Sequence, residues 1–109
     1  MIRIRIKGAA EKIEGFMVWG HAGYAPLGED IICAGVSAIC TSAMIGLAEL
    51  FPENTRYCVL PSGFMYCRLR GSMTQADERD SQLILRVMLL GLKAARESRG
   101  EYIDLTIGG

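Results

Sequence analysis

Apolar and polar residues alternate strictly at the start of the chain. Ile2–Ile6 places isoleucine at every second position and arginine between, the period of a strand with one buried face. Residues 13–19 predict a second strand, antiparallel to the first after a turn over residues 8–12. That strand closes at Gly20-His21, so the only histidine of the chain leaves the sheet at a strand end.

A run without charged residues follows at positions 31–48 and predicts a long helix from Ile31 to Leu50, which Pro52 ends. Asp30 has the side chain of a good N-cap residue. The run is long enough to span a membrane, but its Gly, Ser, Thr and small Ala residues and the two carboxylates before it favour a core helix. We therefore expect no membrane partner.

The second half of the chain predicts a hairpin, a helix and a last strand. Residues 55–60 and 64–70 form the hairpin around a turn at 61–63 that ends in a left-handed glycine, with Tyr57 opposite Cys67. The helix opens with acids at 77–80, stops at Gly100 and is apolar almost all round, so we expect it to be mostly buried, in part by a partner subunit. Residues 103–107 alternate as a final strand.

This order of elements, β-β-α-β-β-α-β, predicts the fold class. We expect an α+β domain of two layers over residues 1–109, with a mostly antiparallel five-stranded sheet and two helices on one face.

The charges are balanced in total and unevenly distributed. Twelve basic and twelve acidic residues give a net charge of zero, which argues against direct binding of nucleic acid or of a membrane surface. Residues 21–55 contain four acids and no Lys or Arg. An acidic region around a site would suit a basic partner or substrate, although a buried helix that lacks long cations explains the same pattern.

The four cysteines predict reduced thiols, because no secretory signal opens the chain. No CxxC pair exists and one histidine cannot complete a ligand set, so we expect no metal. No glycine-rich phosphate loop is present, and no cofactor is expected.

Cys33 and His21 are the candidate catalytic pair. If the helix begins at Ile31, Cys33 lies in its first turn, where the helix dipole and backbone N–H groups favour a thiolate and supply oxyanion donors. Eleven residues separate the two, enough for a loop to bring the imidazole to the sulfur as its base.

Each candidate also has an ordinary structural interpretation. Cys33 also fits a small buried hydrophobe, which is what most free cysteines are, and His21 fits a strand-end residue bonded to a nearby carbonyl. Asp30 is a helix cap or orients the imidazole, and Ser37, one turn beyond Cys33, braces the site or fits a close helix contact. A non-catalytic binding module remains the alternative function.

Two segments resemble a known family. Gly20-His21-Ala22, a loop of about ten residues and then Asp30-Ile31-Ile32-Cys33-Ala34-Gly35-Val36-Ser37 are similar to the signature of the ribosomal-processing cysteine protease family Prp, the YsxB-like proteins. The length, the order of elements and the helical segment Ser81-Gln82-Leu83-Ile84-Leu85 resemble the same family.

This resemblance implies a cytoplasmic, homodimeric cysteine endopeptidase. Its substrate would be the precursor of the bacterial large-subunit ribosomal protein whose tail reaches the peptidyl-transferase centre, cut after a phenylalanine to remove a short N-terminal extension. Cys33 would be the nucleophile and His21 the general base and acid, with Asp30 and Ser37 as supporting residues. The implied substrate loop contains Gly20, Ala22, Gly23, Tyr24, Gly28 and Glu29.

Overall fold

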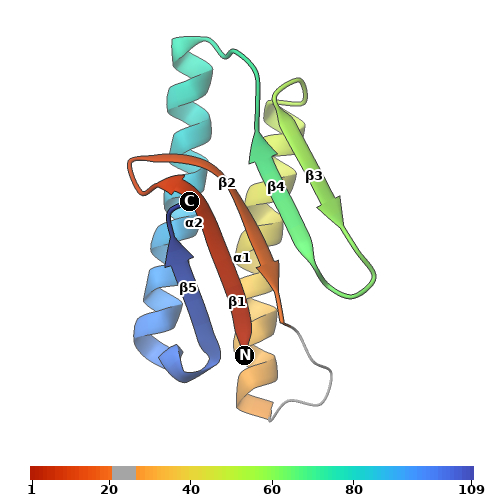
Figure 1. Cartoon of the computed structure of the whole chain (residues 1–109), viewed down its shortest axis with the longest axis vertical. Helices are drawn as coiled ribbons and strands as arrows, with labels where there is room; N and C mark the ends of the chain where they lie inside the picture. The colour runs from red at the N-terminus through yellow and green to blue at the C-terminus, as the bar shows by residue number, and fades with distance from the viewer. Residues whose placement is uncertain (21–26) are drawn as a thin grey trace.

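The computed structural model describes residues 1–20 and 27–109, the side chains of 27–29 excepted. The described part contains five strands, two long helices and a short 3₁₀ turn (Figure 1). In chain order these are β1 (Ile2–Ala9), β2 (Lys12–Trp19), α1 (Leu27–Leu50), β3 (Thr55–Val59), β4 (Met65–Leu69), α2 (Gln75–Arg99), η1 (Gly100–Tyr102) and β5 (Ile103–Ile107).

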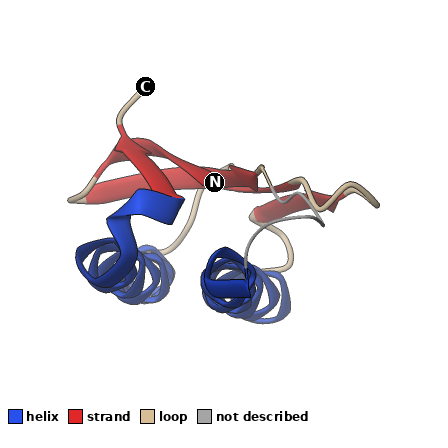
Figure 2. Ribbon diagram, turned by 90° about the horizontal axis from the view of Figure 1, so that it is seen from below, coloured by secondary structure: helices blue, strands red, loops and turns tan. Residues whose placement is uncertain are grey.

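The strands form one sheet in the order β3-β4-β2-β1-β5. Neighbouring strands are antiparallel except β5, which lies parallel to β1. Both helices lie on the same side of this sheet, and the other side carries no helix (Figure 2). The predicted fold class, α+β with two helices on one face of a mostly antiparallel sheet, is confirmed.

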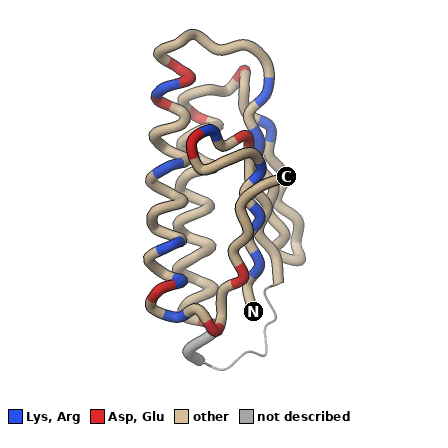
Figure 3. Tube along the Cα trace, turned by 60° about the vertical axis from the view of Figure 1, so that its left-hand side comes forward, with Lys and Arg blue, Asp and Glu red and all other residues tan. Residues whose placement is uncertain are grey.

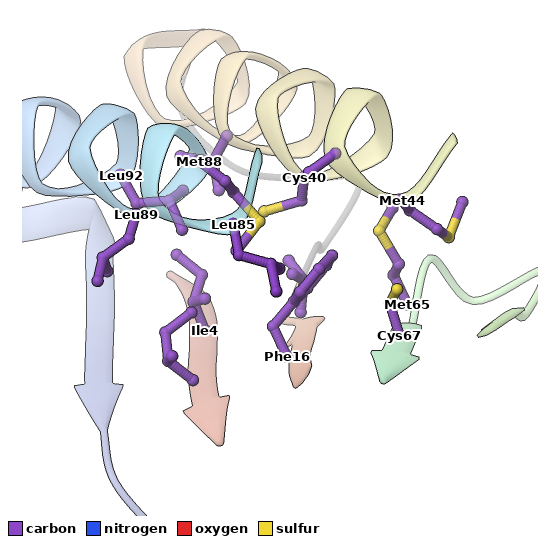
Figure 4. Packing of buried hydrophobic residues seen from close by; sticks show 14 of the residues in the cluster. Ile4, Phe16, Cys40, Met44, Met65, Cys67, Leu85, Met88, Leu89 and Leu92 are labelled. Carbon is purple, nitrogen blue, oxygen red and sulfur yellow. The ribbon is translucent and has the colours of Figure 1, made fainter. Parts of the chain in front are cut away.

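The core lies between the sheet and the helices. The alternation in β1 buries Ile2, Ile4 and Ile6 completely, and Phe16 and Val18 of β2 lie opposite Ile6 and Ile4. Leu85, Met88, Leu89 and Leu92 of α2 and Cys40 of α1 cover these strands from above (Figure 4). The strand residues between them, which include the arginines of β1, therefore point to the uncovered side.

Two predicted boundaries are wrong. The first strand continues to Ala9, so the turn is shorter than expected. The first helix begins at Leu27 instead of Ile31. Gly28 costs a helix only about 1 kcal/mol, and Glu29 and Asp30 are acids that the positive end of a helix dipole favours. These residues therefore extend the helix by one turn, and Asp30 is its fourth residue instead of its cap.

The hairpin has the predicted register and turn. Tyr57 of β3 lies opposite Cys67 of β4, and Gly63 has a φ of +94° in a turn closed by the Gly63 N–H donating to the Leu60 carbonyl at 2.9 Å. β3 is an edge strand, and Tyr57 and Val59 are 56% and 52% exposed although they face the helix side. The helices therefore cover the inner strands and leave β3 partly open.

The second helix is less buried than expected. Thr74 caps it by accepting a hydrogen bond from the Asp77 N–H at 3.1 Å, a cap that the sequence analysis missed. One face is buried, whereas Leu83, Val87 and Leu90 are 57–63% exposed. The all-round apolar pattern thus corresponds to two different faces, one on the sheet and one on the molecular surface.

The first helix also has an apolar outer side. By length and composition, Asp30–Leu50 is the one helix of the described part that is able to cross a membrane, with 33% of its most apolar window buried. Its inner residues Val36, Cys40 and Leu47 belong to the core, while Ile31 and Ile45 are about 60% exposed. A core helix satisfies the same length test, and its packing on the sheet supports that interpretation.

Candidate active site

Cys33 lies on the inner face of α1, in its second turn. It is the seventh residue of the helix, and the buried residues Val36 and Cys40 follow it at helical spacing on the same side. Its side chain is 3% exposed and belongs to the hydrophobic core cluster. The candidate nucleophile therefore lies on helix α1, in the core between this helix and the sheet.

The prediction that Cys33 occupies the first helical turn is wrong. The earlier start of α1 places it six residues beyond Leu27, about 9 Å along the axis at 1.5 Å per residue. The influence of the helix dipole falls off within the first turn, and oxyanion donors must come within about 3 Å of the charge they stabilise. The N–H groups of the first turn are therefore poorly placed to stabilise a thiolate at Cys33.

His21 lies outside the described residues, together with Ala22, Gly23 and Tyr24 of the expected substrate loop. The structure does describe the two ends between which this segment runs. β2 finishes at Trp19 and Gly20, at the same end of the molecule at which α1 begins (Figure 1). Gly28 and Glu29, also expected in the loop, belong to the first turn of α1 instead.

Gly20 fixes the direction in which the chain leaves β2. Its φ is +98°, a conformation that residues with a side chain rarely adopt. A Cβ at this position would lie 2.5 Å from the backbone oxygen of Met1, so any side chain would collide with the start of the chain. Gly20 thus sets the exit path for His21 through its conformation and this close approach, a constraint that the motif alone did not reveal.

Asp30 and Ser37 lie on the same side of α1, because seven residues correspond to about two helical turns. The side chain of Asp30 is exposed in the first turn, so its predicted role as a cap is replaced by that of an acid near the helix N-terminus. Ser37 is half-buried one turn after Cys33, at the spacing that brings two side chains to the same helix face. Ser37 is therefore a neighbour of Cys33.

The other three cysteines differ from Cys33 in position and surroundings. Burial raises the pKa of Cys40 from 9.0 to about 12 and that of Cys67 to about 11, which keeps both as neutral thiols at physiological pH. Cys58 is exposed on the edge strand β3. No group of three potential metal ligands occurs among the residues that the structure describes.

The acidic stretch does not form one surface around Cys33. Glu49 is near the far end of α1, about 24 Å from Cys33 along the helix axis, and Glu53 follows that end. Asp30 alone of the described acidic side chains in this stretch lies near the start of the helix. The uneven charge in the sequence therefore reflects a helix without cations more than an acidic site.

Comparisons with known proteins agree with the resemblance found in the sequence. A family model described as cysteine protease Prp matches residues 1–104. The ribosomal processing cysteine protease Prp of Staphylococcus aureus is 33% identical over 97 residues, which cover 86% of each chain. That of Bacillus subtilis is 27% identical over 97% of this chain and 96% of its own.

Solved structures give the same answer. The S. aureus ribosomal processing protease in complex with a substrate peptide matches 98% of this chain and 99% of its own, with a TM-score of 0.81 and 28% identity. The same protease with a covalently linked product peptide matches over the same shares with a TM-score of 0.77.

Two glycines near the site predict opposite effects of adding one methyl group. We expect Gly20→Ala to destabilise the protein by at least about 1–2 kcal/mol, because its positive φ alone costs that much and the Met1 oxygen blocks the Cβ. Gly35→Ala, in α1 with no atom within 4 Å of its Cβ, should instead stabilise by about 0.5–1 kcal/mol. Urea unfolding of both variants measures the difference, and equal effects would contradict the described exit from β2.

Proposed function

Because this chain belongs to the cysteine protease Prp family, we propose that it removes the N-terminal extension of a bacterial large-subunit ribosomal protein precursor, cutting after a phenylalanine. The proposed substrate is the protein whose tail reaches the peptidyl-transferase centre, and the proposed place is the cytoplasm. The relatives are named for ribosomal processing, and one of them has been solved with a substrate peptide. These findings support a peptide substrate of ribosomal origin for this protease.

We assign covalent catalysis to Cys33 and His21. His21 takes the proton of the thiol, Sγ attacks the scissile carbonyl carbon, and a carbon–sulfur bond forms. His21 then gives the proton to the leaving amine as the peptide bond breaks. A water, deprotonated by His21, hydrolyses the thioester and restores the thiol. The covalently linked product peptide in the S. aureus relative supports such an intermediate.

The observation that carries this assignment is the place of Cys33 among the four cysteines. It lies in the second turn of α1, at the end of the molecule where Gly20 directs the chain into His21 (Figure 1). Cys40 and Cys67 are buried further along the core with raised pKa values, and Cys58 lies on the edge strand. Cys33 is therefore the cysteine nearest to His21 in sequence and the one nearest to the start of α1.

Cleavage of the unprocessed ribosomal protein precursor tests the assignment. We expect Cys33→Ala and His21→Ala each to lower the rate by at least about 10³-fold, because the step that forms the thioester needs both groups. Cys58→Ala should cleave at the rate of the parent protein. Product mass gives the cleaved bond, and circular dichroism shows whether each variant is folded. Cleavage by folded Cys33→Ala would end the proposal.

Alkylation separates a reactive cysteine from a merely buried one. Cys33, Cys40 and Cys67 are all at most 3% exposed, so burial alone predicts equally slow reaction with iodoacetamide. If His21 deprotonates Cys33, we expect Cys33 to react at pH 7 much faster than Cys40 and Cys67, and His21→Ala to abolish that difference. Peptide mass spectrometry after timed quenching measures all four sites, with exposed Cys58 as the internal standard. Equal rates at the three buried cysteines would count against the dyad.

We further propose that the protease works as a homodimer through the outer side of its helical layer. A groove between α1 and α2 is lined mostly by apolar residues of both helices, among them Leu83 and Val87, which are each 63% exposed. Leu90 of α2 is 57% exposed. Apolar residues exposed together are typical of an interface. In a twofold dimer the same patch of each copy would cover the other.

A charge in this groove should separate the copies. We expect Val87→Arg to give a monomer in size-exclusion chromatography with light scattering, because an arginine cannot be desolvated there without a partner charge. Val59→Arg is the matched control, because Val59 is similarly exposed on β3 and should leave the dimer intact. A parent protein that is monomeric at micromolar concentration would contradict the proposal, as would an unchanged dimer in Val87→Arg.

A further inference from the structure

The uncovered side of the sheet gathers basic residues that are far apart in the sequence. Residues of β1, β2, β4 and β3 line up across the strands as Lys7, Gly15, Arg68 and Arg56, each paired with the next. Arg3 and Arg5 extend this row along β1, and Arg70 extends it beyond β4. Figure 3 shows Lys and Arg positions recurring along the strands, away from the helices.

Acids do not balance this surface. Among the described strand residues the acids are Glu14, at the irregularity of β2, and Asp104 of β5. Asp104 pairs with Arg5 at 3.0 Å and lies 3.9 Å from Arg3. Within the described part of the chain, the other basic residues of this face form no ion pair: Lys7, Arg56, Arg68 and Arg70.

Repulsion between these neighbouring cations lowers the stability of the isolated chain. Arg56 and Arg68 lie directly opposite each other on β3 and β4, and like charges in that position are destabilising. Arg70 follows Arg68 by two residues on the same face, about 7 Å further along the strand. A surface with several unpaired cations on neighbouring strands is electrostatically complementary to a chain of phosphates.

The same face also carries an aromatic side chain, the kind of group on which nucleotide bases stack. Tyr66 of β4 lies two residues before Arg68, is half-buried and lies opposite Met17 of β2. A hollow on this face is lined in part by Lys7, Met17, Tyr66 and Arg68. Aromatic side chains on a sheet stack the bases of single-stranded RNA, while neighbouring cations hold its backbone.

We propose that this basic sheet face, defined by Lys7, Arg56, Tyr66, Arg68 and Arg70, binds single-stranded RNA. RNA is the polyanion that fits best, because the relatives act in ribosomal processing and ribosomal proteins assemble on RNA. The face lies on the opposite side of the sheet from α1 and Cys33 (Figure 2). RNA on this face and a peptide at the protease site can therefore be bound at the same time.

This proposal departs from the expectation that balanced charge excludes nucleic acid. The net charge is zero because acids and bases are equal in number, but most acids lie on the helices and turns, whereas the strands concentrate cations on one side. Net charge governs the field at long range, but a backbone of phosphates contacts a local surface. The fold, more than the composition, thus creates the complementarity.

Fluorescence anisotropy with a labelled twenty-nucleotide oligouridine tests the proposal on the full chain. We expect saturable binding at 50 mM salt, with a slope of log K against log salt of about −3 if four cations contact phosphates. The triple variant Arg56→Gln, Arg68→Gln, Arg70→Gln should lose at least about tenfold in affinity and most of that slope. Tyr66→Ala should weaken binding about fivefold or more at an unchanged slope, because stacking does not release ions.

The matched control removes the same charge from the helical layer, as Arg79→Gln, Arg86→Gln, Arg96→Gln, and should bind as the parent does. Equal losses in the two triple variants would overturn the proposal, as would absence of binding at 50 mM salt. Equal or tighter binding of oligothymidine, of poly-glutamate or of vesicles with anionic lipid would overturn the assignment to RNA. Because no arm measures cleavage, failure here leaves the proposed protease function standing.

Discussion

The structure depends on one layer of apolar contacts between the sheet and its two helices. Because both helices lie on the same side, the alternation of β1 and β2 must bury Ile4, Ile6 and Phe16 on that side and expose every other residue on the opposite one. The same contact places the inner face of α1, with Cys33, against the core. The burial of Cys33, the apolar outer groove of the helices and the basic outer face of the sheet all follow from this packing.

The elements themselves were predictable because each follows a simple period. Ile2–Ile6 alternates cleanly, and the turn at 61–63 contains the proline and glycine that its geometry requires. The start of α1 was not predictable in the same way. Asp30 is a good cap, but it is also favourable inside a first turn. No pattern in the sequence before Asp30 indicates which of these two positions it takes. One turn of error changed the electrostatics assigned to Cys33.

Local periodicity also predicts nothing about which distant residues share a surface. The acids of residues 21–55 are close in sequence, but the rigid length of α1 separates Asp30 from Glu49. Arg56, Arg68 and Lys7 are far apart in sequence, yet strand pairing places them in one row. A helix spreads neighbouring charges along its axis, whereas a sheet collects remote ones at spacings of about 5 Å between strands.

The burial of Cys33 constrains how a protease of this family can use it. A sulfur that is 3% exposed is protected from adventitious reaction, but it must contact a carbonyl carbon for attack to occur. Because the first turn of α1 is too distant to stabilise a thiolate, the proposed use of Cys33 as nucleophile depends on a base outside the helix, the role that we propose for His21. The residue before this histidine is Gly20, whose positive φ and close approach to the Met1 oxygen leave no room for a side chain. Under the proposed mechanism, the sulfur and the group that activates it therefore belong to different parts of the fold: the core between sheet and helices holds Cys33, and the base follows the end of β2 in sequence.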